Sequence, residues 1–297
     1  MSFISVWIVT IISVIIMIPF LTLVERKVLS YIQLRKGPNK VGVLGVLQPI
    51  SDGVKLVFKE SGPTIRVNSF LFWITPLLNF VLMLILFIIF SPLFPSYSIN
   101  LGLLGYLCIS SLLVYSILFS GWSSNSKYSF LGSLRGAAQV ISYEISMLTL
   151  IFFPSAISST FNINFINIGF HYSILVFVFV FILWLITIVA ETNRSPFDFA
   201  EGESEIVSGF NTEYSSFIFA LLFLGEYGNI IFISFLTSFI FFPNFPVLYF
   251  IIPIFIIFLF LVFRGTFPRF RYDLLMNLAW KVILPCSLIF FWILFLF

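Results

Sequence analysis

A group of acidic side chains is the part of this sequence best suited to chemistry. The stretch ETNRSPFDFAEGESEIVSGFNTEY, residues 191–214, contains half of the 12 acids of the chain and only one base, Arg194. Its carboxylates are Glu191, Asp198, Glu201, Glu203, Glu205 and Glu213. Such carboxylates can exchange protons or pair with cations, and the surroundings decide which of the two they do.

Acids also occur inside long apolar runs, where an ionised group is costly. Glu144 and Glu226 lie in such runs, and Glu191 closes a third one. One interpretation is structural, with each carboxylate paired to an arginine or held by hydrogen bonds. The other is a polar pathway, because carboxylates in a low-dielectric setting can take and release protons near neutral pH. We favour the pathway, since the three acids lie on the same side as the acidic stretch.

The acidic stretch also carries the pattern of a helix start. Ser195 suits the N-cap, Pro196 suits the first helical position, and Asp198 follows three residues after the cap. Asp198, Glu201 and Glu205 would then share one face, where like charges repel unless cations face them. The candidate cations are Arg26, Arg35, Arg135, Arg269 and Arg271. We expect an acidic wall that faces an arginine-rich wall across a slot, and a solvated acidic face is the alternative.

Ligands for redox cofactors are scarce in this chain. One histidine, His171, cannot complete a haem site that needs two, and Cys108 and Cys286 cannot hold an iron–sulfur cluster. No glycine-rich nucleotide-binding pattern follows a strand, and no serine or cysteine has a nearby histidine to activate it. Any electrons or energy must therefore come from a partner.

The elements that position the acids are predicted to be membrane-spanning helices. The chain is 60% hydrophobic, 20% aromatic and 9% charged, and a soluble domain of that composition would have an apolar surface. Eight runs have the length of about 20 residues that a helix needs to cross a bilayer. They cover about 3–24, 70–91, 101–120, 138–157, 172–191, 215–242, 247–264 and 274–296. The predicted fold class is therefore all-α, a polytopic integral membrane protein with a single transmembrane domain over residues 1–297.

Basic residues alternate from loop to loop along the chain. The first, third, fifth and seventh loops, with their flanking residues, carry 14 of the 15 lysines and arginines, and the other loops carry no charge. This is the positive-inside pattern. It places the charged loops, at about 25–69, 120–137, 191–214 and 264–274, on the cytoplasmic or matrix side, and both termini on the opposite side.

The first charged loop is predicted to contain an amphipathic helix. In VLGVLQPISDGVKLVFK, residues 43–59, apolar residues recur at helical spacing while Asp52 falls on another face. Pro49 is expected to start or bend this helix, which would lie at the membrane interface. It could be a simple surface anchor, or a lid or floor beside a site, and periodicity alone does not choose between the two.

Six segments together resemble one family. They are VERKVLSYIQLRKGPN (24–39), QPISDGVKL (48–56), GWSSNSKYSFLGSLRGAAQVISYE (121–144), ETNRSPFDFAEGESEIVSGFNTEYSS (191–216), EYGNII (226–231) and FPRFRYDLLM (267–276). In these motifs the chain is similar to the chain 1 family of NADH:ubiquinone oxidoreductase, the quinone-site membrane subunit of respiratory complex I, in its mitochondrially encoded form. The resemblance runs from the first span to the eighth.

The resemblance implies a role for the whole chain. In this family the subunit forms, with two hydrophilic partners, a chamber that admits ubiquinone, and it begins the acidic path that couples quinone reduction to proton translocation. The resemblance implies ubiquinone as substrate, no cofactor on this chain, and iron–sulfur clusters and FMN on partner subunits. The implied partners are the peripheral-arm subunits at the quinone site, the antiporter-like membrane subunits and membrane lipid. Nucleic acid is not an implied partner. The implied location is the mitochondrial inner membrane, with the charged loops in the matrix.

The same resemblance assigns candidate residues, although no catalytic residue, no metal ligand and no activity of the isolated chain are expected. The candidates for the quinone chamber are Arg26, Arg35, Asp52, Asp198, Glu201, Glu203, Glu205 and Arg271. The candidates for the proton path are Glu144, Glu191, Glu213 and Glu226. Two alternatives stay open, namely a cation or proton transporter that works alone and a membrane subunit of a hydrogenase-type complex that uses no quinone.

Overall fold

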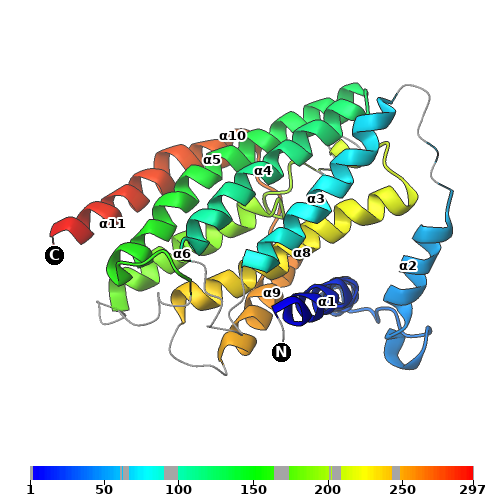
Figure 1. The fold of residues 1–297 in the computed structure, drawn as a ribbon, viewed down its shortest axis with the longest axis horizontal. Helices are drawn as coiled ribbons and strands as arrows, with labels where there is room; N and C mark the ends of the chain where they lie inside the picture. Colours follow the sequence, from blue (N-terminus) through cyan, green and yellow to red (C-terminus); the bar gives the residue numbers. More distant parts are fainter. Residues whose placement is uncertain are drawn as a thin grey trace.

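Long apolar runs of the sequence become long helices in the computed structural model of this chain (Figure 1). The structure describes residues 3–60, 62, 67–89, 100–163, 174–200, 202, 209–242 and 248–296, and these ranges contain helices and no strand. The long helices are α1 (Phe3–Ile32), α3 (Ser69–Ile89), α4 (Gly102–Ser123), α5 (Lys127–Ser158), α6 (Ile174–Glu191), α8 (Ser216–Phe241) and α9 (Leu248–Thr266). The last stretch runs without a break through α10 (Tyr272–Leu278), the π-helical turn η5 (Ala279–Ile283) and α11 (Leu284–Leu296).

The predicted fold class is confirmed. In the described part of the chain, seven helices are long and apolar enough to cross a membrane by length and composition. The shorter apolar helix α6 matches the remaining expected span, so all eight runs correspond to helical segments. The sidedness of the loops stays a prediction.

Two helices extend well beyond the apolar runs that predicted them. Helix α5 begins at Lys127, inside the expected charged loop 120–137, because Ser126 caps it by accepting a hydrogen bond from the Ser129 amide at 3.3 Å. Helix α1 continues to Ile32, past the expected end of its span. Charged residues near the span ends therefore lie on helices and have fixed positions.

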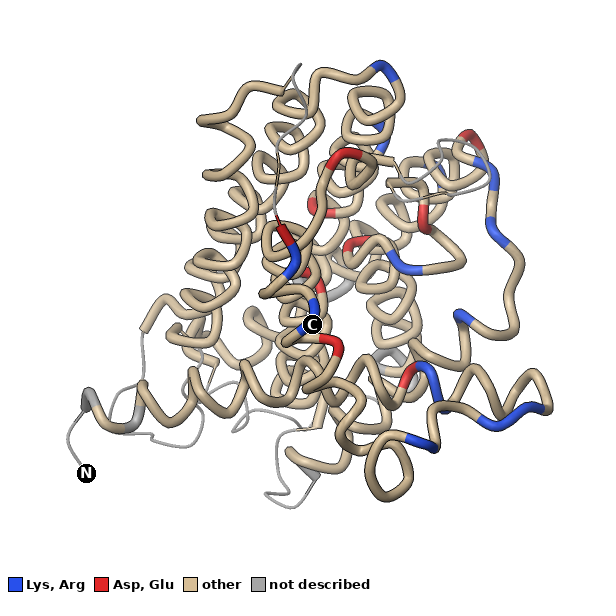
Figure 2. Tube along the Cα trace, turned by 90° about the vertical axis from the view of Figure 1, so that its right-hand side faces the viewer, with Lys and Arg blue, Asp and Glu red and all other residues tan. Residues whose placement is uncertain are grey.

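The long helices pack side by side, with α1 running across the others. Helix α4 lies between α3 and α5, α8 packs against both α3 and α9, and α5 also contacts α6 and α11. Helix α1 is seen nearly end-on in Figure 1 and lengthwise in Figure 2, whereas α3, α4, α5, α6 and α8 run across the view of Figure 1. Its neighbours are α8, α9, α3 and α2, so α1 brings its charged end close to several elements.

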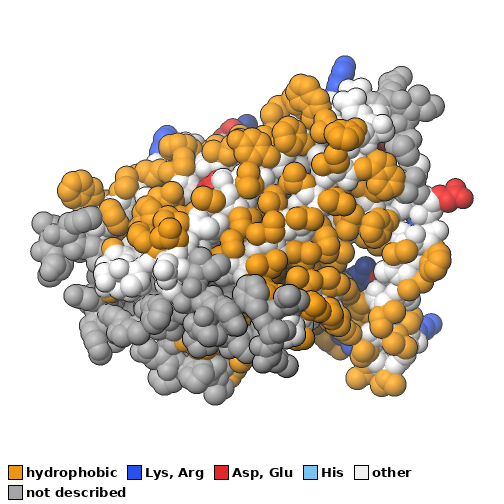
Figure 3. Space-filling view, viewed as in Figure 1, with side chains coloured by type: hydrophobic (Ala, Val, Ile, Leu, Met, Phe, Trp, Pro, Cys, Tyr) orange, Lys and Arg blue, Asp and Glu red, His pale blue; other side chains and the backbone are white. Residues whose placement is uncertain are grey.

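The core lies between α3, α4, α5, α6 and α8, and it contains large aromatic and aliphatic side chains. The fully buried ones include Met83, Tyr106, Tyr143, Met147, Trp184 and Phe232. Apolar side chains also cover most of the described surface in Figure 3. An apolar exterior gives helices in lipid little reason to associate, so close packing and internal polar contacts must hold this bundle together.

Helix α2 (Gln48–Phe58) lies at the edge of the bundle, at the right of Figure 1, and contacts α1 and α8. It follows the short turn η1 (Val43–Gly45) and has Pro49 in its first turn, so the predicted amphipathic helix is confirmed. Its apolar side chains at Ile50, Val54 and Val57 are exposed. Its place at a membrane interface stays a prediction.

Small residues allow the closest helix contacts, and Gly121 shows this best. A Cβ atom at Gly121 would collide with the side chain of Ser133 and lie 2.8 Å from the carbonyl oxygen of Ser129. We expect Gly121→Ala to lower the free energy of unfolding by about 2 kcal/mol, because α4 and α5 must separate. Thermal unfolding of the purified chain in detergent, followed by circular dichroism, measures this change.

The matched control for Gly121→Ala is Gly105→Ala in the same helix. A Cβ atom there would meet only the side chain of Ile89, at 3.4 Å, which is ordinary van der Waals contact. Gly105→Ala should therefore leave the stability unchanged or raise it, since alanine favours the helix. Equal unfolding temperatures for the two variants would contradict the close contact between α4 and α5.

Candidate functional site

Glu191 is the last residue of α6 and is buried between helices, with 5% of its surface exposed. The Tyr106 hydroxyl of α4 donates a hydrogen bond to its Oε1 at 3.4 Å. One turn further along α4, the Ser110 hydroxyl lies 3.4 Å from Oε1 of Glu144 on α5 and donates to it. Helix α4 therefore holds two of the predicted proton-path acids through neighbouring hydroxyl groups.

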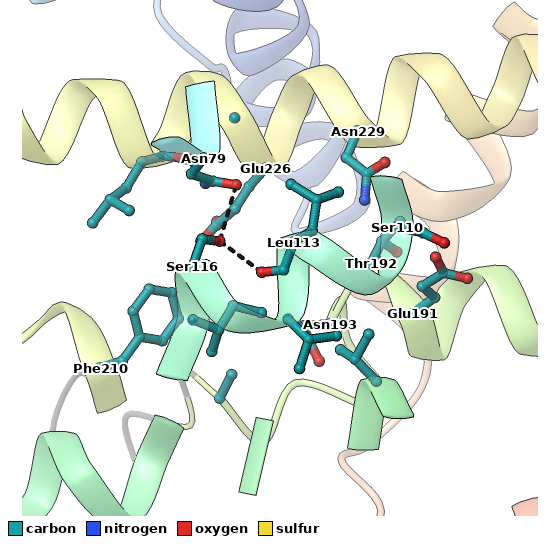
Figure 4. Close-up of a pocket in the computed structure, with 16 residues that line it drawn as sticks. Asn79, Ser110, Leu113, Ser116, Glu191, Thr192, Asn193, Phe210, Glu226 and Asn229 are labelled. Carbon is teal, nitrogen blue, oxygen red and sulfur yellow. Dashed lines mark hydrogen bonds between the residues drawn. The ribbon is translucent and has the colours of Figure 1, made fainter. Parts of the chain in front are cut away.

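A cavity of about 50 Å³, with both apolar and polar side chains on its wall, is lined by Glu191 and Glu226. Figure 4 shows Glu226 on α8 beside Asn79, and Glu191 near Ser110 on the other side of the cavity. The polar side chains on its wall are Asn79, Ser110, Ser116, Thr192, Asn193 and Asn229. The second carboxylate oxygen of Glu191, Oε2, is buried without a hydrogen-bond partner among the described residues. A cavity of this size and polarity can hold a few water molecules that hydrogen-bond to such groups.

A partly buried ionic network joins α1, α8, α9 and the turn after α6. Glu25 of α1 forms an ion pair with Arg264 of α9, and its Oε2 accepts a hydrogen bond from the Tyr227 hydroxyl at 2.7 Å. Arg194 Nη1 donates to the same hydroxyl at 3.4 Å, and Arg194 Nη2 lies 3.9 Å from Oε2 of Glu226. We call these five residues the Glu25 network, and a second cavity of about 20 Å³ lies beside it.

The end of α1 is also tied to α2. Arg26 Nη1 is 2.6 Å from Oδ2 of Asp52, and the Gln48 side chain donates to the other oxygen of the same carboxylate at 2.9 Å. Two of the quinone-chamber candidates, Arg26 and Asp52, are therefore in direct contact. Arg35 does not join them, because its Nε donates to the Gln33 side chain on the exposed surface at 2.9 Å.

Asp198 does face an arginine across the fold, as the predicted acidic and basic walls require. Arg269 lies in the segment that follows α9, and its Nη2 atom is 3.3 Å from Oδ2 of Asp198. Arg271 instead pairs with Asp273 at 3.0 Å on the surface. Glu213 is half-buried between the short turn η4 (Gly209–Asn211) and α8. The remaining acids of the predicted wall, Glu201, Glu203 and Glu205, lie outside the described residues.

The predicted helix start at Ser195 is wrong for the described residues. Residues 192–200 form turns and bends, and the Ser195–Pro196 peptide bond is cis. Phe197 and Phe199 are both buried, and the Phe199 amide donates to the Phe197 carbonyl at 3.1 Å, which is a turn contact and not a helical one. The amide group of Gln139 on α5 donates to the carbonyls of Ala190 and Phe197, at 2.7 and 2.8 Å. Tertiary packing against α5 therefore outweighs the local capping pattern.

Tyr214 fixes the far end of the acidic loop to the bundle. Its ring stacks on Phe72 with the centroids 4.3 Å apart, and its hydroxyl lies 2.8 Å from the Ser123 hydroxyl and 3.2 Å from that of Thr75. Burial raises the pKa of Tyr214, and the hydrogen bonds with Ser123 and Thr75 oppose this in part. The hydroxyl therefore keeps its proton at neutral pH and donates to the Ser120 carbonyl.

Sequence reasoning missed Glu25, Tyr227 and Arg264. Glu25 directly follows the expected first span and Arg264 ends the expected seventh span, so both were counted with the charged loops. Tyr227 adjoins Glu226, and a tyrosine beside an intramembrane acid was the only local signal for it. Among the described residues, no group of three or more His, Cys, Asp or Glu side chains could hold a metal ion.

Fold and buried charges together define a polytopic all-α membrane protein with ionisable side chains between its helices. The chain belongs to the NADH dehydrogenase family, whose model matches residues 4–295. NADH-ubiquinone oxidoreductase chain 1 of Aedes aegypti is 49% identical to it over 284 residues, which cover 94% of this chain and 90% of that protein. Proteins of the same name from Rhipicephalus sanguineus and Branchiostoma lanceolatum are 48% and 47% identical, over 94% and 93% of this chain.

Proposed function

We propose that this chain is a membrane subunit of the proton-translocating NADH:ubiquinone oxidoreductase, respiratory complex I, of the mitochondrial inner membrane. The observation that carries the proposal is a cavity shared by two acids, Glu191 and Glu226, inside a membrane bundle whose relatives are named for that reductase. The chain acts only within the assembled enzyme. Its partners are the peripheral-arm subunits and the antiporter-like membrane subunits, and the iron–sulfur clusters and FMN belong to those partners.

The quinone chamber, in this proposal, lies beside the charged loops. Reduction of a quinone by two electrons creates anionic oxygen and requires two protons, so a reaction site needs both cations and acids nearby. Arg26 with Asp52, and Arg269 with Asp198, are oppositely charged pairs that supply both kinds of group. They lie on four different segments of the chain, and their charges can respond when a negative charge appears in the chamber.

The proton path begins at the buried acids. Glu191 and Glu226 line one cavity. Ser110 of α4 lies on the wall of the same cavity and donates a hydrogen bond to Glu144. Carboxylates that interact across a short distance titrate together, so a change of charge on one shifts the proton occupancy of the next. We propose that this coupling carries the effect of quinone reduction away from the chamber, toward the antiporter-like subunits.

Labelling by a quinone analogue tests the chamber. We expect a photoreactive ubiquinone analogue, added to the assembled complex, to modify peptides from residues 25–60 and 191–200, and excess ubiquinone to suppress this labelling. Peptides from α11, which lies at the far end of the bundle in Figure 1, provide the internal control. Labelling that spares both loops, or that ubiquinone does not suppress, would favour a hydrogenase-type complex without quinone.

A further inference from the structure

The last membrane-spanning stretch, formed by α10, η5 and α11, packs on the bundle along one side. Leu275, Ala279, Ile283 and Ser287 recur every four residues and are all buried. The Thr149 hydroxyl of α5 donates to the Ser287 hydroxyl at 2.7 Å, so this buried side faces α5. Figure 1 shows α10 and α11 at the edge of the bundle, beside α5. The opposite side of the stretch therefore faces away from the bundle.

That opposite side carries polar side chains, which we call the polar stripe. Asp273, Asn277 and Lys281 also recur every four residues, each two positions before a buried residue, and all three are exposed. Asp273 pairs with Arg271 at 3.0 Å. Within the described part of the chain, no hydrogen bond or ion pair reaches the side chain of Asn277 or Lys281.

The backbone is irregular at the same place. Pro285 has no N–H group, so it cannot donate to the Lys281 carbonyl four residues before it. The chain there forms the π-helical turn η5, in which the Leu284 amide donates to the Ala279 carbonyl, five residues before it. Single π-helical turns are frequent at functional positions of helices. Lys281 therefore lies where regular helical bonding is interrupted.

The exposed side of α9 shows what a lipid-facing surface looks like in this protein. Its exposed side chains include Phe250, Ile251, Ile254, Phe255 and Phe258, which are all apolar. Lipid tails cannot form hydrogen bonds with an amide and solvate an ammonium group poorly, so both groups are costly in contact with them. The polar stripe is therefore poorly suited to lipid tails.

The side chains of the polar stripe do not escape this cost by reaching the membrane surface. At the usual rise per residue, Lys281 lies about 13 Å along the helix axis from Tyr272, where α10 begins. The four-carbon stem of a lysine spans roughly 6 Å, about half of that distance. Asn277 has no long stem and cannot move its amide group away from its own depth. Polar groups of another protein segment at the same depth would satisfy both residues.

We propose that the polar stripe is the contact surface for a membrane helix of another subunit, which presents a carboxylate to Lys281 and a hydrogen-bonding side chain to Asn277. A carboxylate supplies the opposite charge and the hydrogen-bond acceptors that an ammonium group needs away from water. The inference rests on the proposed function only in that the chain assembles with other membrane subunits. It does not depend on the quinone chamber or on the proton path.

A membrane-soluble carbodiimide tests the contact in the purified complex. The reagent activates a carboxylate, and an amine in contact with that carboxylate then forms an amide bond while the reagent leaves as a urea. We expect mass spectrometry to find Lys281 joined to an Asp or Glu of another membrane subunit. Lys281→Arg should lose only this cross-link, because a guanidinium does not react in this way. A complex in which Lys281 is joined to no other subunit would overturn the inference.

Variants measure how much the contact contributes to assembly. Lys281→Met should lower the amount of assembled complex about tenfold, because it leaves the carboxylate of the partner unpaired in the membrane. Lys281→Arg keeps the charge and should retain most of the complex. Ile254→Met places a methionine on the exposed side of α9 and should change nothing. NADH oxidation by a soluble artificial acceptor, after separation of the complex by native electrophoresis, measures these amounts.

Quinone reduction per assembled complex should be equal in all three variants, because neither residue lines the cavity of Glu191 and Glu226. A lower rate per complex in Lys281→Met would place Lys281 in the reaction machinery and overturn its role as a contact. If removal of lipid from the unaltered complex causes the same loss as Lys281→Met, and anionic phospholipid reverses it, a lipid headgroup binds Lys281 and the inference is wrong.

Two further outcomes separate the inference from the proposed function. If the unaltered chain is absent from the NADH-oxidising complex, the proposed function fails and the inference fails with it. If the unaltered chain is present and Lys281→Met assembles normally, only the contact surface is overturned.

Discussion

We expect Glu191→Gln to lower coupled quinone reduction of the assembled complex roughly a hundredfold. Glutamine keeps the size of the side chain and can still accept the hydrogen bond of Tyr106, but it cannot take up and release a proton. The buried carboxylate is therefore changed in charge alone, with the packing at the end of α6 preserved. Rates of NADH-driven quinone reduction and of proton uptake into vesicles measure the effect.

The control for Glu191→Gln is Glu60→Gln. Glu60 is an exposed acid just after α2, and Ser216 contacts only its backbone carbonyl. Its replacement removes the same charge from the chain and should leave both rates unchanged. Full coupled activity in the Glu191 variant would show that this acid has a structural role, which is the other interpretation of an acid within a membrane span.

Arg264→Gln is expected to destabilise the assembled complex by about 2 kcal/mol. The side chain of Glu25 is only 7% exposed, and without Arg264 its carboxylate keeps the Tyr227 hydroxyl but loses the opposite charge. The expected loss is smaller than for a fully buried pair, because Arg264 is 40% exposed and water already screens part of the interaction. The temperature at which the purified complex loses this subunit measures the change.

Two comparisons show whether charge is responsible for the loss in Arg264→Gln. Replacing both Glu25 and Arg264 by leucine removes the whole ion pair and should restore most of the stability, since no unpaired charge stays buried. Arg271→Gln breaks a pair with Asp273 whose side chains are 80% and 66% exposed, and it should have almost no effect. A double leucine variant less stable than Arg264→Gln would contradict this account.

The helices were predictable because the bilayer requires long apolar segments, and each expected span has a helical counterpart. Helix α2 was predictable for a similar reason, since its apolar spacing and Pro49 are both local signals. Helix ends were less predictable. Lys127 and Glu25 are charged and were assigned to loops, yet both lie on helices that continue past the apolar runs.

The contacts within the site were only partly predictable. An arginine facing Asp198 was expected, but the choice of Arg269 over Arg271 depends on how the chain turns after α9. The Glu25 network joins residues more than 200 positions apart in the sequence, and no local pattern contains that information. The failure at Ser195 has the same origin, because burial of Phe197 and Phe199 against the bundle favoured a series of turns over a capped helix.

The two hydrogen bonds of Gln139 have a mechanical consequence. Its side-chain amide is fully buried in the middle of α5. It donates at the same time to the carbonyl of Ala190, which precedes Glu191, and to the carbonyl of Phe197, which precedes Asp198. Because Gln139 is fully buried, neither acid can shift relative to α5 unless one of these bonds stretches out of reach of bulk solvent. The end of α6 and the turn after it are therefore held rigidly against α5. A displacement of α5 would move the carboxylates of Glu191 and Asp198 together.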